Sequence, residues 1–235
     1  MGFLRELGEG LAQTVYPENL YCMACNDFLE GTDSQFGLCA RCMSEMFSEE
    51  NLKGTLGKDC TGRSYSRVLA CTVYGGLSKE VIGKFKNKQM PWLGKNLGKL
   101  MAERFCEERS EVAADLVTFV PIHPEKKRLR GYDQAQLMAE QVGRSLGISC
   151  VGCLERTRKT AAMKNMSEEQ RNQNVAGAFD WKGDMPLLGK RVILVDDIVT
   201  TGSTAEACAS VLRRAGAKDV TVLAFAVAAH KSFDK

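Results

Sequence analysis

Short apolar runs alternate with amphipathic stretches along most of this 235-residue chain. Val192 to Val195 are four consecutive apolar residues, three of them β-branched, which predicts a strand buried on both faces, as in the interior of a parallel sheet. Comparable patterns predict strands at 67–74, 116–120 and 220–227, and helices at 78–87, 93–108, 133–146 and from Ser203 to a stop at Gly216. Alternating strands and helices predict an α/β fold with parallel strand pairing.

The polar and basic run at 155–174 shows little apolar periodicity. We expect it to form a long loop. Long loops on α/β scaffolds often close over a site as lids.

The strand predicted at Val192 to Val195 leads directly into two acids, Asp196 and Asp197. Ligands of open α/β sheets bind outside the carboxyl ends of the strands. Ser203 and Glu206 fit the Ser-x-x-Glu capping box that begins a helix. The plainer alternative is that the acids only end a strand and Ser203 only caps a helix.

The turn between the acids and the helix is typical of a phosphate site. A helix amino terminus offers N–H groups and a positive dipole, and Gly202 allows close backbone approach. The neighbouring hydroxyl donors are Thr200, Thr201, Ser203 and Thr204. Two acids beside a phosphate site indicate a ligand that carries both a sugar diol and a phosphate, as a ribose 5-phosphate does.

Two Cys-x-x-Cys pairs near the amino terminus, Cys22 with Cys25 and Cys39 with Cys42, have the spacing of a single tetrahedral zinc site. Two disulfides or a redox motif are the alternatives. Residues 1–10 are charged and lack the apolar core of a signal peptide, so we expect a cytoplasmic protein with structural zinc. The pattern assigns no role to Cys60, Cys150 or Cys153.

Chain length and composition favour two units. We expect a zinc-ribbon module at 1–50 and an α/β domain at 67–235, joined through a glycine-containing stretch at 51–66. The net charge of +3 decides little, but basic blocks at 79–99 and 156–164 suit either polyanions or solvated helix faces. No apolar run approaches the roughly twenty residues of a membrane span.

The segment 192–204 resembles the phosphoribosyl pyrophosphate (PRPP) signature of type I phosphoribosyltransferases. The motifs at 120–124, 128–135 and 174–179 and the amino-terminal cysteines resemble the ComF-like competence protein family. The resemblance implies a zinc ribbon followed by a type I phosphoribosyltransferase domain, in proteins tied to DNA uptake during natural transformation.

In type I phosphoribosyltransferases the acid pair holds the ribose hydroxyls and the threonine-rich turn binds the 5-phosphate. These roles would fall on Asp196 and Asp197 and on residues 200–204, with Mg²⁺ on the diphosphate of PRPP. Arg128, Arg130 and Lys86 are our candidates for binding that diphosphate, although the two arginines could equally be plain surface residues. His123 could carry a proton or be a hydrogen-bonded loop residue.

Two functions stay open at this point. The chain could transfer phosphoribosyl to an unknown acceptor. Alternatively, it could be a non-catalytic module that senses PRPP or a nucleotide and binds single-stranded DNA or a DNA-uptake protein. A PRPP-dependent regulator of transcription is a weaker alternative, because no helix-turn-helix pattern is visible.

Overall fold

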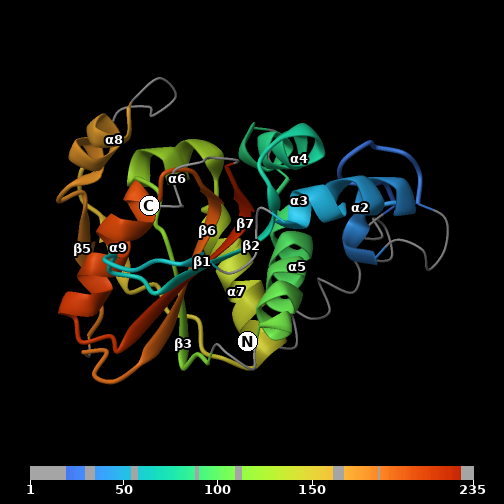
Figure 1. The fold of residues 1–235 in the computed structure, drawn as a ribbon. Coiled ribbons are helices and arrows are strands. Elements are labelled where there is room, and N and C mark those ends of the chain that lie inside the picture. Colours follow the sequence, from blue (N-terminus) through green and yellow to red (C-terminus); the bar gives the residue numbers. More distant parts are fainter. Residues whose placement is uncertain are drawn as a thin grey trace, which may run out of the picture.

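The computed structural model describes residues 20–29, 35–53, 58–87, 90–108, 113–160, 167–184 and 186–228. Its centre is a five-stranded sheet in the order β1-β2-β7-β6-β3 (Figure 1). The strands are β1 (Lys58–Asp59), β2 (Arg67–Val73), β3 (Leu116–Phe119), β6 (Arg191–Val199) and β7 (Asp219–Val227). Strands β2, β7, β6 and β3 pair in parallel, which confirms the predicted pairing, and β1 is an antiparallel edge.

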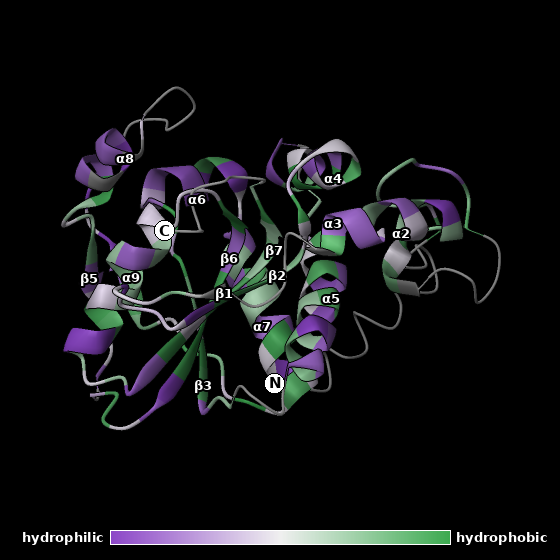
Figure 2. Ribbon diagram, in the orientation of Figure 1, coloured by the Kyte–Doolittle hydropathy of each residue, from purple (hydrophilic) through white to green (hydrophobic). Residues whose placement is uncertain are grey.

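Helices cover both faces of the sheet, and hydrophobic residues are frequent along the strands between them (Figure 2). Helices α4 (Gly76–Asn87), α5 (Leu93–Glu107) and α7 (Gln134–Leu146) share one buried cluster with the first face. Helix α9 (Ser203–Arg214) packs on the other face. The predicted helices and central strands are therefore confirmed within one or two residues at most ends, because their apolar periodicity matches real burial.

Helices α5 and α7 approach each other closely because glycines stand at the contact. A Cβ atom on Gly98 would lie 2.6 Å from Cβ of Gln141, and one on Gly94 would lie 2.7 Å from Cβ of Leu137. This close packing fixes α7, whose amino-terminal end borders the site described below.

The cysteine-containing segment comprises the 3-10 helix η2 (Gln35–Gly37), α2 (Ala40–Met46) and α3 (Glu49–Lys53). It lies at the end of the molecule beyond α4 and α5 (Figure 1). Its buried residues belong to the same apolar cluster as α4 and α5, and Thr72 Oγ1 donates a hydrogen bond to the carbonyl of Met46 at 2.7 Å. The division at 51–66 stays a prediction, and Gly54 and Gly57 lie outside the described residues.

Four short elements differ from the sequence expectations. Strands β4 (Leu154–Arg156) and β5 (Phe179–Trp181) form a separate antiparallel pair, and α8 (Glu168–Val175) follows in the run expected to be a loop. Helix α6 (Pro124–Arg130) occupies the basic stretch after β3. The loop expectation is thus wrong at both ends of 155–174, while 161–166 lie outside the described residues. Hydrophobic periodicity cannot predict α6 and α8, because α6 has no buried side chain and the sequence of α8 is almost wholly polar.

Among the described helices, none combines the length and the apolar character that crossing a bilayer requires.

Candidate functional site

A cavity of about 470 Å³ opens at the carboxyl ends of the parallel strands. Helices α4, α6 and α8 lie along this edge of the sheet (top of Figure 1). The cavity brings together six of the residues that the sequence proposed for ligand binding, which come from α4, α6, β6 and the turn after it: Lys86, Arg130, Asp196, Asp197, Thr200 and Thr204.

The two acids lie inside strand β6, which continues to Val199 instead of ending before them. Asp197 Oδ2 lies 2.5 Å from Nζ of Lys86, and the Asp197 amide donates to Asp196 Oδ1 at 2.8 Å. Burial and the neighbouring Asp197 carboxylate raise the pKa of Asp196 well above its usual range. One acid is therefore neutralised by a lysine, and the other holds a proton more readily.

The cavity is also lined by three cations that were not among the candidates from the sequence: Lys126, Arg156 and Arg171. Burial and the nearby cations, Arg156 first among them, lower the pKa of Lys126. With Lys86 and Arg130, the lining carries five cations against two carboxylates. Of these three residues, only Arg156 had a signal in the sequence, because it lies in the basic block at 156–164.

Arg156 and Arg171 lie near opposite ends of the run at 155–174, and each contacts a neighbouring side chain. The Arg156 guanidinium stacks over the Phe179 ring at 5.1 Å, and Arg171 donates to Thr200 Oγ1 at 3.3 Å. The Nε atoms of both arginines are buried and have no hydrogen-bond partner among the described residues. A buried donor without a partner is energetically costly, so these two arginines are incompletely satisfied in this arrangement.

The turn at 200–204 differs from the predicted capping box. Helix α9 begins at Ser203, its N-cap is Gly202, and no side chain caps it. The Glu206 carboxylate accepts instead from the amide and the hydroxyl of Ser64. The capping-box prediction is wrong because a partner distant in sequence outcompetes the local contact.

Thr201, Gly202 and Ser203 do not line the cavity, and Thr201 Oγ1 lies 2.8 Å from Ser203 Oγ. Gly202 has a φ of 77°, in the left-handed region, and an added Cβ would collide with the Tyr65 hydroxyl. The sequence attributed this glycine to close approach of a ligand. The contact found here is with a buried tyrosine.

Three residues near the cavity have other surroundings. Arg128 is exposed on α6 and does not line the cavity. His123 is the N-cap of α6 and accepts at Nδ1 from the Glu125 amide at 3.3 Å, which matches the loop-residue alternative. Asp133 is buried and caps α7, accepting from the amides of Ile122 at 3.0 Å and Gln136 at 3.3 Å, and burial raises its pKa.

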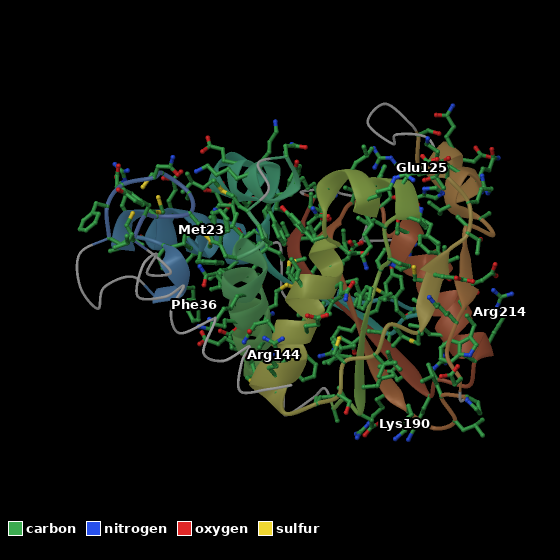
Figure 3. All side chains as sticks on the ribbon, turned by 180° about the vertical axis from the view of Figure 1, so that it is seen from behind. Met23, Phe36, Glu125, Arg144, Lys190 and Arg214 are labelled. Carbon is green, nitrogen blue, oxygen red and sulfur yellow. The ribbon has the colours of Figure 1, made fainter. Side chains whose placement is uncertain are left out.

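The four amino-terminal cysteines form one cluster that could hold a metal ion. The sulfur atoms of Cys22, Cys25, Cys39 and Cys42 all lie within 4.8 Å of one another, and those of Cys25 and Cys39 are 3.8 Å apart. Four Zn–S bonds of about 2.3 Å in a tetrahedron would separate the sulfurs by about 3.8 Å. Sulfur atoms gather beside Met23, which lies between the first two cysteines (Figure 3). None of the ten cysteines forms a disulfide.

Comparison with known proteins adds two findings. Residues 134–235 match the family model described as the phosphoribosyl transferase domain. Competence protein F of Haemophilus influenzae is 26% identical over 213 residues, which cover 87% of this chain and 89% of that protein.

Two other relatives show the same level of similarity. The DNA utilization protein YhgH of Escherichia coli K12 is 26% identical over 203 residues, or 80% of this chain and 88% of that protein. The competence protein ComFC of Streptococcus pneumoniae is 26% identical over 193 residues, or 78% and 84%. The chain is therefore similar to ComF-like competence proteins over most of its length, and its parallel α/β sheet and the match at 134–235 are of the type I phosphoribosyltransferase kind.

Proposed function

We propose that this protein binds PRPP in the cavity at the sheet edge and acts as a phosphoribosyltransferase-like protein in DNA uptake. The single observation that carries this proposal is the composition of the cavity. Two acids, two threonines and five cations converge there from separate elements. A ligand with a diol, a monophosphate and a diphosphate uses all three kinds of group.

The ribose and its 5-phosphate belong to the β6 side of the cavity in this proposal. Asp196 and Asp197 accept hydrogen bonds from the 2′- and 3′-hydroxyls. Thr200 and Thr204 donate to the phosphate, together with the amino-terminal end of α9, where Thr201, Gly202 and Ser203 form the backbone of the turn. The helix dipole favours a dianion at this position.

The diphosphate belongs to the cationic side. Lys86, Lys126 and Arg130 face it from α4 and α6, and the guanidinium groups of Arg156 and Arg171 add positive charge to the same lining. Arg128 lies outside the cavity lining and is the weakest of our candidates. Mg²⁺ bound with PRPP would supply charge neutralisation on the diphosphate, and the two acids would accept hydrogen bonds from its water ligands.

The chemistry that this arrangement suits is transfer at C1 of the ribose. A nucleophilic acceptor forms a bond to C1, the bond from C1 to the diphosphate oxygen breaks, and the diphosphate leaves with the electron pair. Positive charge develops on the sugar beside the acids, and negative charge grows on the leaving group beside the cations. The acceptor stays unassigned.

We further propose that the cysteine cluster holds structural Zn²⁺. The sulfur spacing supports this choice, because it suits a tetrahedral ion with thiolate ligands. None of the ten cysteines forms a disulfide, which favours a reducing compartment and supports a cytoplasmic location.

The second candidate is a non-catalytic module that holds PRPP or a nucleotide and binds single-stranded DNA or a DNA-uptake protein. One observation favours it. Tyr21 and Phe28 on the cysteine segment are 61% and 59% exposed, and their rings form an edge-to-face pair at 5.9 Å. Exposed aromatic rings are stacking surfaces for unpaired bases.

Calorimetric titration with PRPP and Mg²⁺, followed by assays of diphosphate release with bases and nucleosides, separates the two candidates. Release that depends on one acceptor supports a transferase. PRPP binding without turnover, together with salt-sensitive retention of single-stranded DNA that is lost in Tyr21→Ala, supports the module. No binding of PRPP contradicts both.

A further inference from the structure

Helix α4 connects the cysteine cluster to the cavity through two lysines near its carboxyl-terminal end. Lys84 Nζ donates to the carbonyl oxygens of Met23 at 3.0 Å and Ala24 at 2.6 Å, and to Asn26 Oδ1 at 3.1 Å. Met23 and Ala24 are the two residues between Cys22 and Cys25. One ammonium group therefore binds the backbone of the first cysteine knuckle.

Two residues farther along the same helix, Lys86 reaches into the cavity and contacts Asp197. Each residue turns an α-helix by about 100°, so side chains two positions apart project to opposite sides. Lys84 and Lys86 can therefore bind different parts of the molecule while sharing one rigid turn.

Phe85, between the two lysines, is fully buried, and its ring stacks on Tyr132 with centroids 5.7 Å apart. Its carbonyl accepts from the Tyr132 hydroxyl and from Gln134 Nε2. Gln134 also accepts from Arg130 at 2.6 Å. The last turn of α4 is thus held on the cavity side by residues that line or border the cavity, and on the other side Lys84 binds the knuckle.

We infer that Lys84 is a positioning residue for PRPP binding, because it anchors α4 to the Cys22–Cys25 knuckle and so sets the position of Lys86. This inference rests on the proposed function. If Lys84 acts in this way, the cysteine segment helps to set the geometry of the diphosphate subsite, although no cysteine lines the cavity. A purely structural lysine would support α4 without acting through Lys86.

A double-mutant cycle tests this connection by calorimetric titration with PRPP and Mg²⁺. Lys86→Met should weaken PRPP binding about tenfold or more, because a charged contact with the diphosphate is lost. Lys84→Met should weaken it about 2- to 30-fold, and this effect should largely disappear in the Lys86→Met background. Lys79→Met, which removes an exposed lysine from the same helix, is the matched control and should bind like the wild type. Lys84→Arg, which retains charge and donors, should recover most of the affinity.

A second measurement needs no ligand. Hydrogen exchange followed by mass spectrometry should show faster exchange at the carboxyl-terminal end of α4 in Lys84→Met than in Lys79→Met. Zinc content and the unfolding temperature establish that each variant is folded, and Lys84→Gln replaces Lys84→Met if the latter does not fold.

Unchanged exchange in α4, or an equal loss of PRPP affinity with and without Lys86, would overturn the role of Lys84. If the wild type binds no PRPP, the proposed function fails. The exchange measurement still decides whether Lys84 anchors the helix.

Discussion

Lys86 and Asp197 form an ion pair of 2.5 Å across the cavity, between α4 and β6. The adjacent Asp196 has a raised pKa and accepts a hydrogen bond from the Asp197 amide. The two neighbouring acids are therefore stabilised in different ways. The Asp197 carboxylate is paired with Lys86, and Asp196 tends to retain a proton. A diphosphate would compete with Asp197 for Lys86, which frees that carboxylate for a sugar hydroxyl.

Asp196 should make the ligand-free protein less stable as the pH rises. Its raised pKa means that the folded protein binds this proton more tightly than the unfolded chain does. The resulting stabilisation is complete below the ordinary Asp pKa and is lost as the pH rises through the raised value. Asp196→Asn should therefore unfold at about the same temperature as the wild type near pH 4. Near pH 8.5 it should unfold about 2–4 °C higher, which corresponds to about 1 kcal/mol. Thermal melts across this range check it, and a variant that is less stable at high pH would contradict the assignment.

The fold should tolerate replacement of Asp133 by Asn but should be destabilised by its truncation to Ala. Its carboxylate caps α7 and accepts from the Ile122 amide, while burial raises its pKa. Asp133→Asn keeps an acceptor and removes a buried charge, so we expect stability at pH 7 equal to the wild type or slightly higher. Asp133→Ala loses the cap and should cost about 1–2 kcal/mol. Urea unfolding measures both, and equal losses in the two variants would contradict the capping role.

Gly202→Ala should destabilise the fold by about 1–3 kcal/mol, because the position has a positive φ and the new methyl group meets the Tyr65 hydroxyl. Tyr65→Phe removes that hydroxyl. The double variant Gly202→Ala with Tyr65→Phe should therefore recover part of the loss, as measured by chemical denaturation. If Tyr65→Phe gives no recovery, the collision is not the cause.

Metal removal should loosen the cysteine segment before the sheet. The segment's own buried residues are few, namely Cys22, Met23, Ala24, Leu29, Leu38, Cys42 and Met46. Without the metal they provide too little apolar burial to hold the segment. After treatment with a zinc chelator, hydrogen exchange should rise within 20–53 while β6 and β7 stay protected. Unchanged exchange in 20–53 would argue against a structural metal.

The main elements of the fold could be predicted from the sequence because their burial is periodic. Strand β7 is buried at eight of its nine positions, and α9 buries Cys208, Val211 and Leu212 on one stripe. Helix α8 could not be predicted in this way, since its sequence is almost wholly polar. Strands β4 and β5 span three residues each, too few for an alternating pattern to register.

The residues of the site also fall into two groups, those that a sequence motif identifies and those that only the fold brings together. Asp196, Asp197 and the turn after them are contiguous, so a motif identifies them. Lys126 and Arg171 are single residues from different helices, and only tertiary packing brings them to the same cavity. The capping box failed for the same reason, because the Ser64 partner of Glu206 is distant in sequence. Local patterns identify contiguous groups, and they missed Lys126 and Arg171, which the fold brings to the cavity from separate helices.

The most direct test of the central claim is PRPP binding by Asp196→Asn with Asp197→Asn. Calorimetric titration with PRPP and Mg²⁺ should show at least about a hundredfold loss of affinity, because neutral amides replace both carboxyl groups that accept from the ribose hydroxyls. Zinc content should stay unchanged. Asp180→Asn with Asp184→Asn removes two exposed carboxylates outside the cavity and should bind like the wild type. Wild-type affinity in the Asp196 and Asp197 double variant would contradict the assignment of this cavity to PRPP.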